Sequence, residues 1–439
     1  MRVLVTVLLL AVAYAKHEQY IGWKSYVVAP NSTEQLKSVT ALIPQFDLDF
    51  LNYASVQRPG IVLVRPEHQS GFTKALEDAG VVYGIHADDV KGKLDLDDEL
   101  IAARRDSFAR SGRVELPYDN YQTLEAIYAY LDDVAARHPD KVTLVNGGPS
   151  FEGRPIKYLK ISTTNFEDLS KPVIFIDGGI HAREWISPPT ITWAIHKLLD
   201  DGSEPDLLDR FDWILIPVAN PDGYSFSFTN SRFWRKTRST DQHALSTMCP
   251  GVDGNRNYDF FWNTVGSSSL PCADTYAGSR AFSEIETRLI RDLIDEHLAR
   301  IALYLTMHSY GSMILYPWGH DGSLSNNALA LHTVGIAMSD AIFAKSLPNF
   351  PRYIVGNSVL VIGYPASGAS EDYAHWVGVP LSYTYELPGL AGGFEGFHLN
   401  PIYIQNVAQE TWDGIAVGNF FLLLHLSRIN VIIYCSFFI

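Results

Sequence analysis

Four short and almost unbroken apolar runs constrain the fold of this chain more than any other feature. They are "KPVIFIDGG" (171–179), "FDWILIPVAN" (211–220), "IALYLTMH" (301–308) and "PLSYTYEL" (380–387). A strand that is covered on both faces is apolar at nearly every position, whereas a strand with one wet face alternates. Helical periodicity fills the stretches between, as in residues 121–138, where Leu124, Ile127, Leu131 and Val134 share one face. These patterns predict an α/β fold with a central mixed, mostly parallel twisted sheet and helices on both faces.

Residues 16–110 carry a different pattern. Their strand-like runs are 61–65 and 81–85, and their helix-like segments are 33–43 and 68–80. Such alternation over a short length predicts a small α+β domain. The larger α/β domain would then occupy residues 111–428.

The connection between the two predicted domains is the highly charged segment 97–116, "DDELIAARRDSFARSGRVEL". One interpretation is a solvated helix between domains. The other is an activation segment that a trypsin-like protease cuts after Arg110 or Arg113, because such enzymes cleave exposed connectors. The residues alone do not separate the two.

Both ends of the chain are apolar. Residues 1–15, "MRVLVTVLLLAVAYA", have one Arg, a short apolar core and a small-x-small ending, which predicts a secretory signal peptide cut after Ala15 and an extracellular protein. The tail 429–439 is too short to cross a membrane, so we expect no membrane association and assign the tail no role.

The net charge of −15 argues against nucleic acid as a partner.

Secretion makes disulfide bonds possible, and the chain has three cysteines. Cys249 and Cys272 lie in one loop-rich segment and fit a single structural disulfide. Cys435 is the odd one and lies in the apolar tail.

Ionisable residues follow two of the apolar runs. His181 and Glu184 come just after the run 171–179, and His308 ends the run 301–308. Ligands of such sheets bind beyond the carboxyl ends of strands. Two His and one Glu with one position left for water are the ligands of a catalytic zinc site, and Asp253 is a candidate acceptor for the outer nitrogen of a His ligand. The alternative is a charged surface turn.

Seven motifs occur in an order that is specific to one family. They are "HAREW" (181–185), "NPDGY" (220–224), "FWRKTRS" (233–239), "GVDGNRN" (251–257), "HSYGS" (308–312), "YPASGASEDY" (364–373) and "YTYEL" (383–387). With them the chain resembles secreted zinc carboxypeptidases of the pancreatic or digestive A/B type, which are made as proenzymes. The resemblance implies an activation prodomain with an antiparallel sheet over residues 16–110, a catalytic domain over 111–428, one Zn²⁺, and a location such as a digestive lumen. It also implies peptide substrates with a free C-terminus, and we expect a monomer.

The resemblance further implies a role for each matching residue. His181, Glu184 and His308 would bind zinc, and Asp253 would orient His181. Glu386 would be the general base toward a water that zinc activates, and Arg238 would stabilise the oxyanion. The residues expected to bind substrate are Asn255, Arg256 and Tyr364 at the terminal carboxylate, and Arg183, Arg235, Ser309 and Tyr310 along the groove. Cys249 and Cys272 match the disulfide of the family.

Glu371 carries the expected substrate preference. In this family an acidic residue at its position in the pocket accompanies removal of C-terminal Lys or Arg, since a buried carboxylate needs a cation. The alternative is an A-type preference for aromatic or aliphatic ends, which Gly319 and Val359 favour. Pro388 stands where many relatives have a charged pair, which leaves the shape of the loop after Glu386 open.

Two further functions compete with the zinc exopeptidase. A non-catalytic binding protein would have lost a ligand or the base, yet all of them are present. A zinc deacylase or amidase would not need the carboxylate clamp of Asn255, Arg256 and Tyr364, nor a prodomain. The zinc carboxypeptidase therefore remains the leading prediction.

Overall fold

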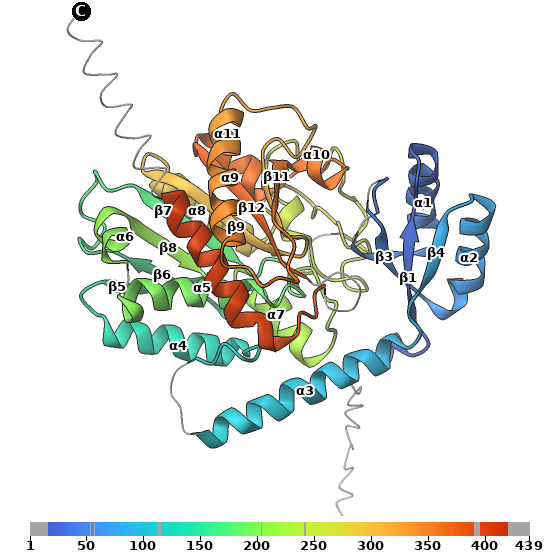
Figure 1. The fold of residues 1–439 in the computed structure, drawn as a ribbon, viewed down its shortest axis with the longest axis horizontal. Coiled ribbons are helices and arrows are strands. Elements are labelled where there is room, and N and C mark those ends of the chain that lie inside the picture. Colours follow the sequence, from blue (N-terminus) through green and yellow to red (C-terminus); the bar gives the residue numbers. More distant parts are fainter. Residues whose placement is uncertain are drawn as a thin grey trace, which may run out of the picture.

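The computed structural model describes residues 16–52, 54–56, 58–111, 116–202, 204–240, 243–389 and 396–419. The predicted signal peptide, Arg113 and the tail 429–439 lie outside the described residues. Figure 1 shows a small N-terminal unit beside a large unit, with helix α3 (Val90–Ser111) running from the first along the second. Arg110, the other expected cleavage point, lies near the C-terminal end of α3.

The N-terminal unit is built on a four-stranded antiparallel sheet with the order β2-β3-β1-β4. Val28, Val62 and Val64 on its strands pack against Phe72 and Leu76 of helix α2 in a buried core. This confirms the expected α+β organisation with an antiparallel sheet. The elements are η1 (Glu18–Tyr20), β1 (Lys24–Ala29), α1 (Thr33–Phe46), β2 (Asp49–Asn52), β3 (Gly60–Val64), η2 (Pro66–His68), α2 (Gln69–Asp78) and β4 (Val82–Ala87).

The large unit is built on an eight-stranded mixed sheet with the order β11-β10-β12-β9-β7-β8-β6-β5. Three of its four parallel pairings join the central strands β12, β9, β7 and β8, and the fourth joins β10 to the edge strand β11. Its three antiparallel pairings are β10 with β12, β8 with β6, and β6 with β5. The sheet therefore confirms the mixed, mostly parallel prediction. Its strands are β5 (Val142–Pro149), β6 (Pro155–Ile161), β7 (Val173–Gly178), β8 (Asp212–Ile216), β9 (Ile301–Ser309), β10 (Met313–Tyr316), β11 (Ile354–Asn357) and β12 (Leu381–Leu387).

Helices cover both faces of this sheet, which explains the unbroken apolar runs. On β7, Ile174 and Ile176 enter one core while Val173 and Phe175 enter the other. Helices α4, α5, α9 and the helical segment 404–419 contribute to the first core, and α8 and α11 to the second. The helices of the large unit are α4 (Leu124–Arg137), α5 (Ser187–His196), η3 (Lys197–Asp201), α6 (Pro205–Arg210), α7 (Pro221–Thr229), η4 (Gly254–Arg256), α8 (Ile285–His297), α9 (Ala328–Phe343), α10 (Ser358–Ile362), α11 (Ser370–Val377) and η5 (Pro401–Tyr403).

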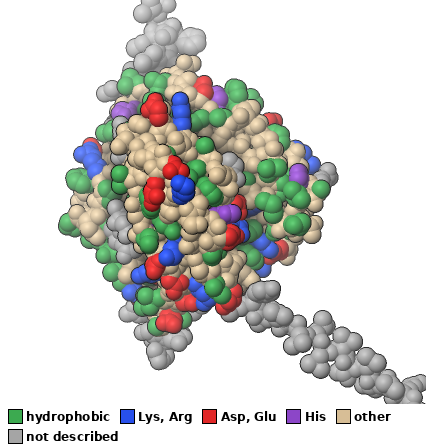
Figure 2. All heavy atoms as spheres, turned by 90° about the vertical axis from the view of Figure 1, so that its right-hand side faces the viewer, with side chains coloured by type: hydrophobic (Ala, Val, Ile, Leu, Met, Phe, Trp, Pro, Cys, Tyr) green, Lys and Arg blue, Asp and Glu red, His purple; other side chains and the backbone are tan. Residues whose placement is uncertain are grey.

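The surface is polar and mixed in charge. Figure 2 shows acidic and basic side chains interspersed on the face turned toward the viewer. Across the part of the chain that the structure describes, none of the helices combines the length and the apolar character that crossing a membrane requires.

Candidate metal centre and active site

The turn after β7 presents the first two metal-ligand candidates. Gly179 turns the chain with a φ of 66°, and a Cβ there would approach the backbone of Val218 at 3.3 Å, so glycine suits this position. The amide of Glu184 then donates to the carbonyl of His181 at 3.3 Å. This single turn brings the two side chains to one side, just before α5 begins.

His181, Glu184 and His308 form one buried cluster, whose candidate ligand atoms all lie within 4.8 Å of one another. The Nδ1 atom of His181 lies 2.8 Å from Oε1 of Glu184, and Nδ1 of His308 lies 3.0 Å from Oε2. The two Nδ1 atoms are 3.0 Å apart. The sheet brings His308 here because β7 and β9 are neighbouring parallel strands that end at the same edge.

The cluster fits a zinc ion. Each ring directs its other nitrogen, Nε2, at an oxygen: His181 at Asp253 over 2.9 Å and His308 at Thr306 over 3.2 Å. With a proton on each Nε2, the two Nδ1 lone pairs and the carboxylate of Glu184 converge, and a shared cation satisfies such a convergence. Two imidazoles and one carboxylate are the ligands expected of catalytic zinc.

Asp253 connects the metal cluster to Arg235. Its Oδ1 accepts from His181 and from the amide of Asn255, and its Oδ2 accepts from Nε and Nη2 of Arg235 at 3.1 and 3.0 Å. The Nη1 atom of Arg235 also lies 3.8 Å from Oε1 of Glu184. Although Asp253 is buried, the guanidinium of Arg235 and the imidazole of His181 hold its pKa well below the ordinary value.

Glu386 lies beside the cluster because β12 pairs with β9 in a register that sets it opposite His308. Burial, reinforced by the charge of Glu184, raises the pKa of Glu386 to about 8. His308 and Arg235 act in the opposite direction, and a bound divalent cation would lower this pKa further. A carboxyl group with a tunable pKa next to a metal site has the properties of a general base.

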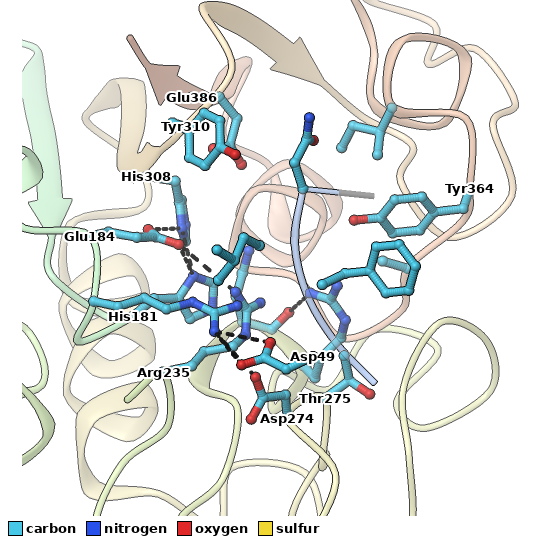
Figure 3. A pocket seen from close by; sticks show the side chains of 18 of the residues that line it. Asp49, His181, Glu184, Arg235, Asp274, Thr275, His308, Tyr310, Tyr364 and Glu386 are labelled. Carbon is cyan, nitrogen blue, oxygen red and sulfur yellow. Dashed lines mark hydrogen bonds and ion pairs between the residues drawn. The ribbon is translucent and has the colours of Figure 1, made fainter. Parts of the chain in front are cut away.

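These groups line one cavity of about 620 Å³. Figure 3 shows Tyr364 across the cavity from His308 and Glu386, with its hydroxyl directed inward. The expected site residues that line the cavity are His181, Arg183, Glu184, Arg235, Asn255, Arg256, His308, Ser309, Tyr310, Tyr364, Glu371 and Glu386.

Asn255 and Arg256 are held by the backbone around them. Arg256 donates through Nε to Gly266 O at 2.9 Å and through Nη1 to Asn255 O at 2.7 Å. Asn255 accepts from the amide of Ser370 at 2.8 Å. Both side chains are therefore oriented before a ligand arrives, which suits recognition of a carboxylate.

Ser309 and Tyr310 follow His308 directly, and the peptide bond between them is cis. The amide of Ser309 donates to Oε2 of Glu184 at 3.2 Å. The ring of Tyr310 packs edge-on against Phe397, with ring centroids 5.1 Å apart. The backbone of this turn thus supports a metal ligand while its side chains line the groove.

Glu371 lies in the first turn of α11, deep in the same cavity. It is 5% exposed, and the side chain of Thr384 lies within hydrogen-bonding reach of its carboxyl group. Burial, together with the neighbouring charge of Asp372, raises its pKa to about 7. A buried carboxylate in a cavity favours a cationic partner.

The structure corrects one predicted site residue, Arg238. Its guanidinium lies over the rings of Phe226 and Trp234, 3.8 and 4.7 Å from their centroids, and its Nε donates to Glu152 at 3.3 Å. Arg238 does not line the cavity, whereas Arg235, three residues earlier, does. The partners of each guanidinium explain the difference: Asp253 holds Arg235 at the metal cluster, whereas two aromatic rings and Glu152 hold Arg238 outside the cavity.

The sequence prediction missed the residues that the N-terminal unit contributes. Asp49 and Arg58 line the cavity. Asp49 contacts Nη1 of Arg183 at 3.3 and 3.5 Å, and the same nitrogen lies 3.3 Å from Asp274 (Figure 3). A lone Asp or Arg in a short surface strand or loop has no sequence signal that would have identified it.

The expected disulfide between Cys249 and Cys272 is present. It joins the segment after Arg238 to the loop that carries Asp274. Cys272 itself lies on the wall of the cavity, so the crosslink holds one side of the substrate groove.

Comparison with known proteins agrees with this geometry. Residues 127–414 match the zinc carboxypeptidase family and residues 26–96 match the carboxypeptidase activation peptide. A carboxypeptidase B of Helicoverpa zea is 64% identical over 95% of this chain and 98% of its own, and carboxypeptidase A2 of Mus musculus is 36% identical over 91% and 93%. The crystal structure of carboxypeptidase A from Helicoverpa armigera superposes with a TM-score of 0.87 at 45% identity, covering 92% of this chain and 98% of that one. The chain therefore belongs to the zinc carboxypeptidases that are made with an activation peptide, and it is a metallocarboxypeptidase proenzyme.

Proposed function

We propose that the enzyme is secreted and removes Lys or Arg from the C-terminus of peptides. The observation that carries the proposal is Glu371, a buried carboxylate in the cavity that holds the metal ligands. The similarity to a relative named carboxypeptidase B supports the same preference. The A-type alternative has relatives of its own among the carboxypeptidases A.

We assign the proton transfers to Glu386. Its carboxylate would take a proton from the attacking water and deliver it to the leaving amine. His181, Glu184 and His308 would hold zinc, which as a Lewis acid polarises the scissile carbonyl and lowers the pKa of a water from about 15.7 to about 7. The register of Glu386 opposite His308 supports this division of roles.

We assign oxyanion stabilisation to Arg235 in place of Arg238. Two hydrogen bonds to Asp253 hold its guanidinium before substrate arrives, and a preorganised donor acts when negative charge develops. Asn255, Arg256 and Tyr364 would bind the terminal carboxylate of the substrate. An internal peptide bond offers no such carboxylate, which accounts for cleavage at the chain end alone.

The N-terminal unit would keep the enzyme inactive until a trypsin-like protease cuts near Arg110 or Arg113. Asp49 and Arg58 on the wall of the cavity support this function. If full-length protein were as active on a small peptide as trypsin-treated protein, the inhibitory role would be wrong. The signal peptide over residues 1–15 and a monomeric enzyme in an extracellular lumen remain part of the proposal.

Paired kinetics test the substrate preference. Peptides that differ only in a final Lys, Arg, Phe or Leu should give the highest kcat/KM with Lys or Arg on trypsin-treated enzyme. Glu371→Gln should lower kcat/KM for the basic substrates by about 30-fold or more, since a buried charge would lose its partner, and should spare Phe. A higher kcat/KM for Phe in the wild-type enzyme would overturn the assignment.

A further inference from the structure

The two histidines of the metal cluster are supported in different ways. His181 donates from Nε2 directly to a carboxylate, Asp253, at 2.9 Å. The Nε2 atom of His308 instead faces the hydroxyl of Thr306 at 3.2 Å. Thr306 in turn lies 3.0 Å from Oδ1 of Asp177. A carboxylate therefore stands behind each histidine, but behind His308 it acts through a hydroxyl.

The sheet register produces this second arrangement. Strands β7 and β9 are parallel, and Asp177 pairs with Thr306. Thr306 and His308 are two residues apart on β9, so their side chains point to the same face. All three side chains are 1% exposed or less. No loop has to move to bring them together.

The available protons decide which group donates in the hydrogen bonds that link Asp177, Thr306 and His308. A carboxylate only accepts, so the single hydroxyl proton of Thr306 goes to Asp177. The oxygen of Thr306 then offers a lone pair to His308, which requires a proton on Nε2. Nδ1 of His308 is left with its lone pair directed at the metal cluster, 3.0 Å from Oε2 of Glu184.

The burial of Asp177 is difficult to explain by stability alone. Burying a carboxylate is destabilising, and hydrogen bonds from the side chains of Tyr304 and Thr306 offset only part of that cost. An apolar residue in this apolar strand would avoid that cost. A function in the metal site accounts for the carboxylate.

We propose that Asp177, acting through Thr306, is a positioning residue that holds His308 in the Nε2-protonated tautomer and so sets the affinity of the enzyme for zinc. Outer partners of metal-binding histidines fix the tautomer and the ring orientation, and their loss typically lowers metal affinity about 10–100-fold. Neither residue contacts the substrate in this assignment.

Zinc affinity tests the proposal, measured by chelator competition on the full-length proenzyme. Thr306→Val removes the hydroxyl at nearly constant shape and should weaken zinc binding about 10–100-fold. Thr306→Ser retains the hydroxyl and should restore the affinity to within a few-fold of wild type. Asp177→Asn still accepts from Thr306 but carries no charge, so its affinity should lie between the two.

A matched control separates positioning from stability. Thr287 is also fully buried and donates to a side-chain oxygen, that of Asn257 at 2.8 Å, and neither Asn257 nor Glu284, whose carbonyl oxygen it also contacts, is a metal ligand. Thr287→Val should lower the melting temperature of the zinc-free protein without changing zinc affinity. The visible spectrum of the cobalt-substituted protein should change in Thr306→Val and not in Thr287→Val.

The proposal is overturned if Thr306→Val binds zinc as tightly as Thr287→Val does, or if Thr306→Ser is as weak as Thr306→Val. Should Thr306→Val fail to fold, zinc affinity and the cobalt spectrum are measured on Asp177→Asn instead. If both equal those of the wild type, the positioning role of Asp177 is rejected.

Discussion

The cavity has two walls, and their charged groups are held in different ways. One wall carries the metal ligands, and the N-terminal unit supplies the other. His308 and Glu386 stand opposite each other on paired strands; His308 is buried and Glu386 half-buried, and most of the charges that act on them come from the large unit. Asp49 reaches the cavity from the edge strand β2, and the guanidinium of Arg58 reaches the large unit through a 3.8 Å contact of Nη1 with the sulfur of Met313. The first wall is part of the sheet, whereas the second comes from a separate unit of the fold. Under the proposed function, the first would supply permanent chemistry and the second would supply inhibition that cleavage removes.

The largest effect is expected from Glu386 on the permanent wall. Glu386→Gln removes the base while it keeps the shape, and kcat should fall about 10²–10⁴-fold. KM and zinc content should stay near wild type, because the substitution touches no metal ligand. Steady-state kinetics and metal analysis of trypsin-treated enzyme provide the test, and a loss below tenfold would remove Glu386 from the mechanism.

Arg235 and Arg238 form a matched pair that tests the corrected assignment. Arg235→Ala should lower kcat about 10²–10³-fold, as loss of an oxyanion donor does. Arg238→Ala should change kcat by less than threefold, since its guanidinium lies over Phe226 and Trp234 outside the cavity. Equal losses in the two variants would contradict the division between them.

A smaller effect is expected from the pH dependence of the pocket. The pKa of Glu371 is raised to about 7, so the carboxyl is protonated below this pH and ionised above it. Only the ionised form attracts a cation. The ratio of kcat/KM for Lys to that for Phe should therefore rise about tenfold between pH 6 and pH 8. Glu371→Gln should make the ratio independent of pH; a wild-type ratio that stays flat would show that Glu371 does not bind the basic side chain.

The smallest effect concerns the removable wall. Burial and the charge of Asp274 raise the pKa of Asp49 to about 7 in the docked unit, against the effect of Arg183, and release would return it to about 3.9. The docked state thus binds a proton more tightly, so docking is strongest below about pH 4 and weakens as pH rises to about 7.

Size-exclusion chromatography after tryptic cleavage measures this docking. The fraction of the N-terminal unit that stays bound should fall a few-fold from pH 5 to pH 8. Asp49→Asn imitates the protonated form and should remain bound at pH 8 as wild type does at pH 5. Stronger retention of the wild type at pH 8 would reverse the sign of the expected effect.

Much of the site could be predicted from the sequence, because the patterns that indicate it lie within short segments. His181 and Glu184 lie in one turn after an apolar strand, and His308 ends another, so the common rule for parallel sheets places them together. Glu386 was identifiable in the same way, as a carboxylate within an apolar strand. The layered fold followed from the same runs, since only strands covered on both faces are apolar throughout.

Other features depend on contacts between distant segments. Asp177 was visible as an acidic residue at the end of an apolar run, yet its link to His308 exists only through the pairing of β7 with β9. The contact of Asp49 with Arg183 joins the sheet of the N-terminal unit to the turn after β7. No spacing in the sequence encodes either of them.

The sequence by itself determined the fold class and indicated the metal ligands, because hydrophobic periodicity and strand ends are properties of short segments; the role of Glu386 was implied by the family resemblance. Only the tertiary structure decided which arginine of "WRKTR" faces the metal site, since both carry the same charge three residues apart. Asp253 accepts from Arg235, while aromatic rings and Glu152 hold Arg238 on the outside. The direction of a long charged side chain is set by the partners that the rest of the fold brings to it.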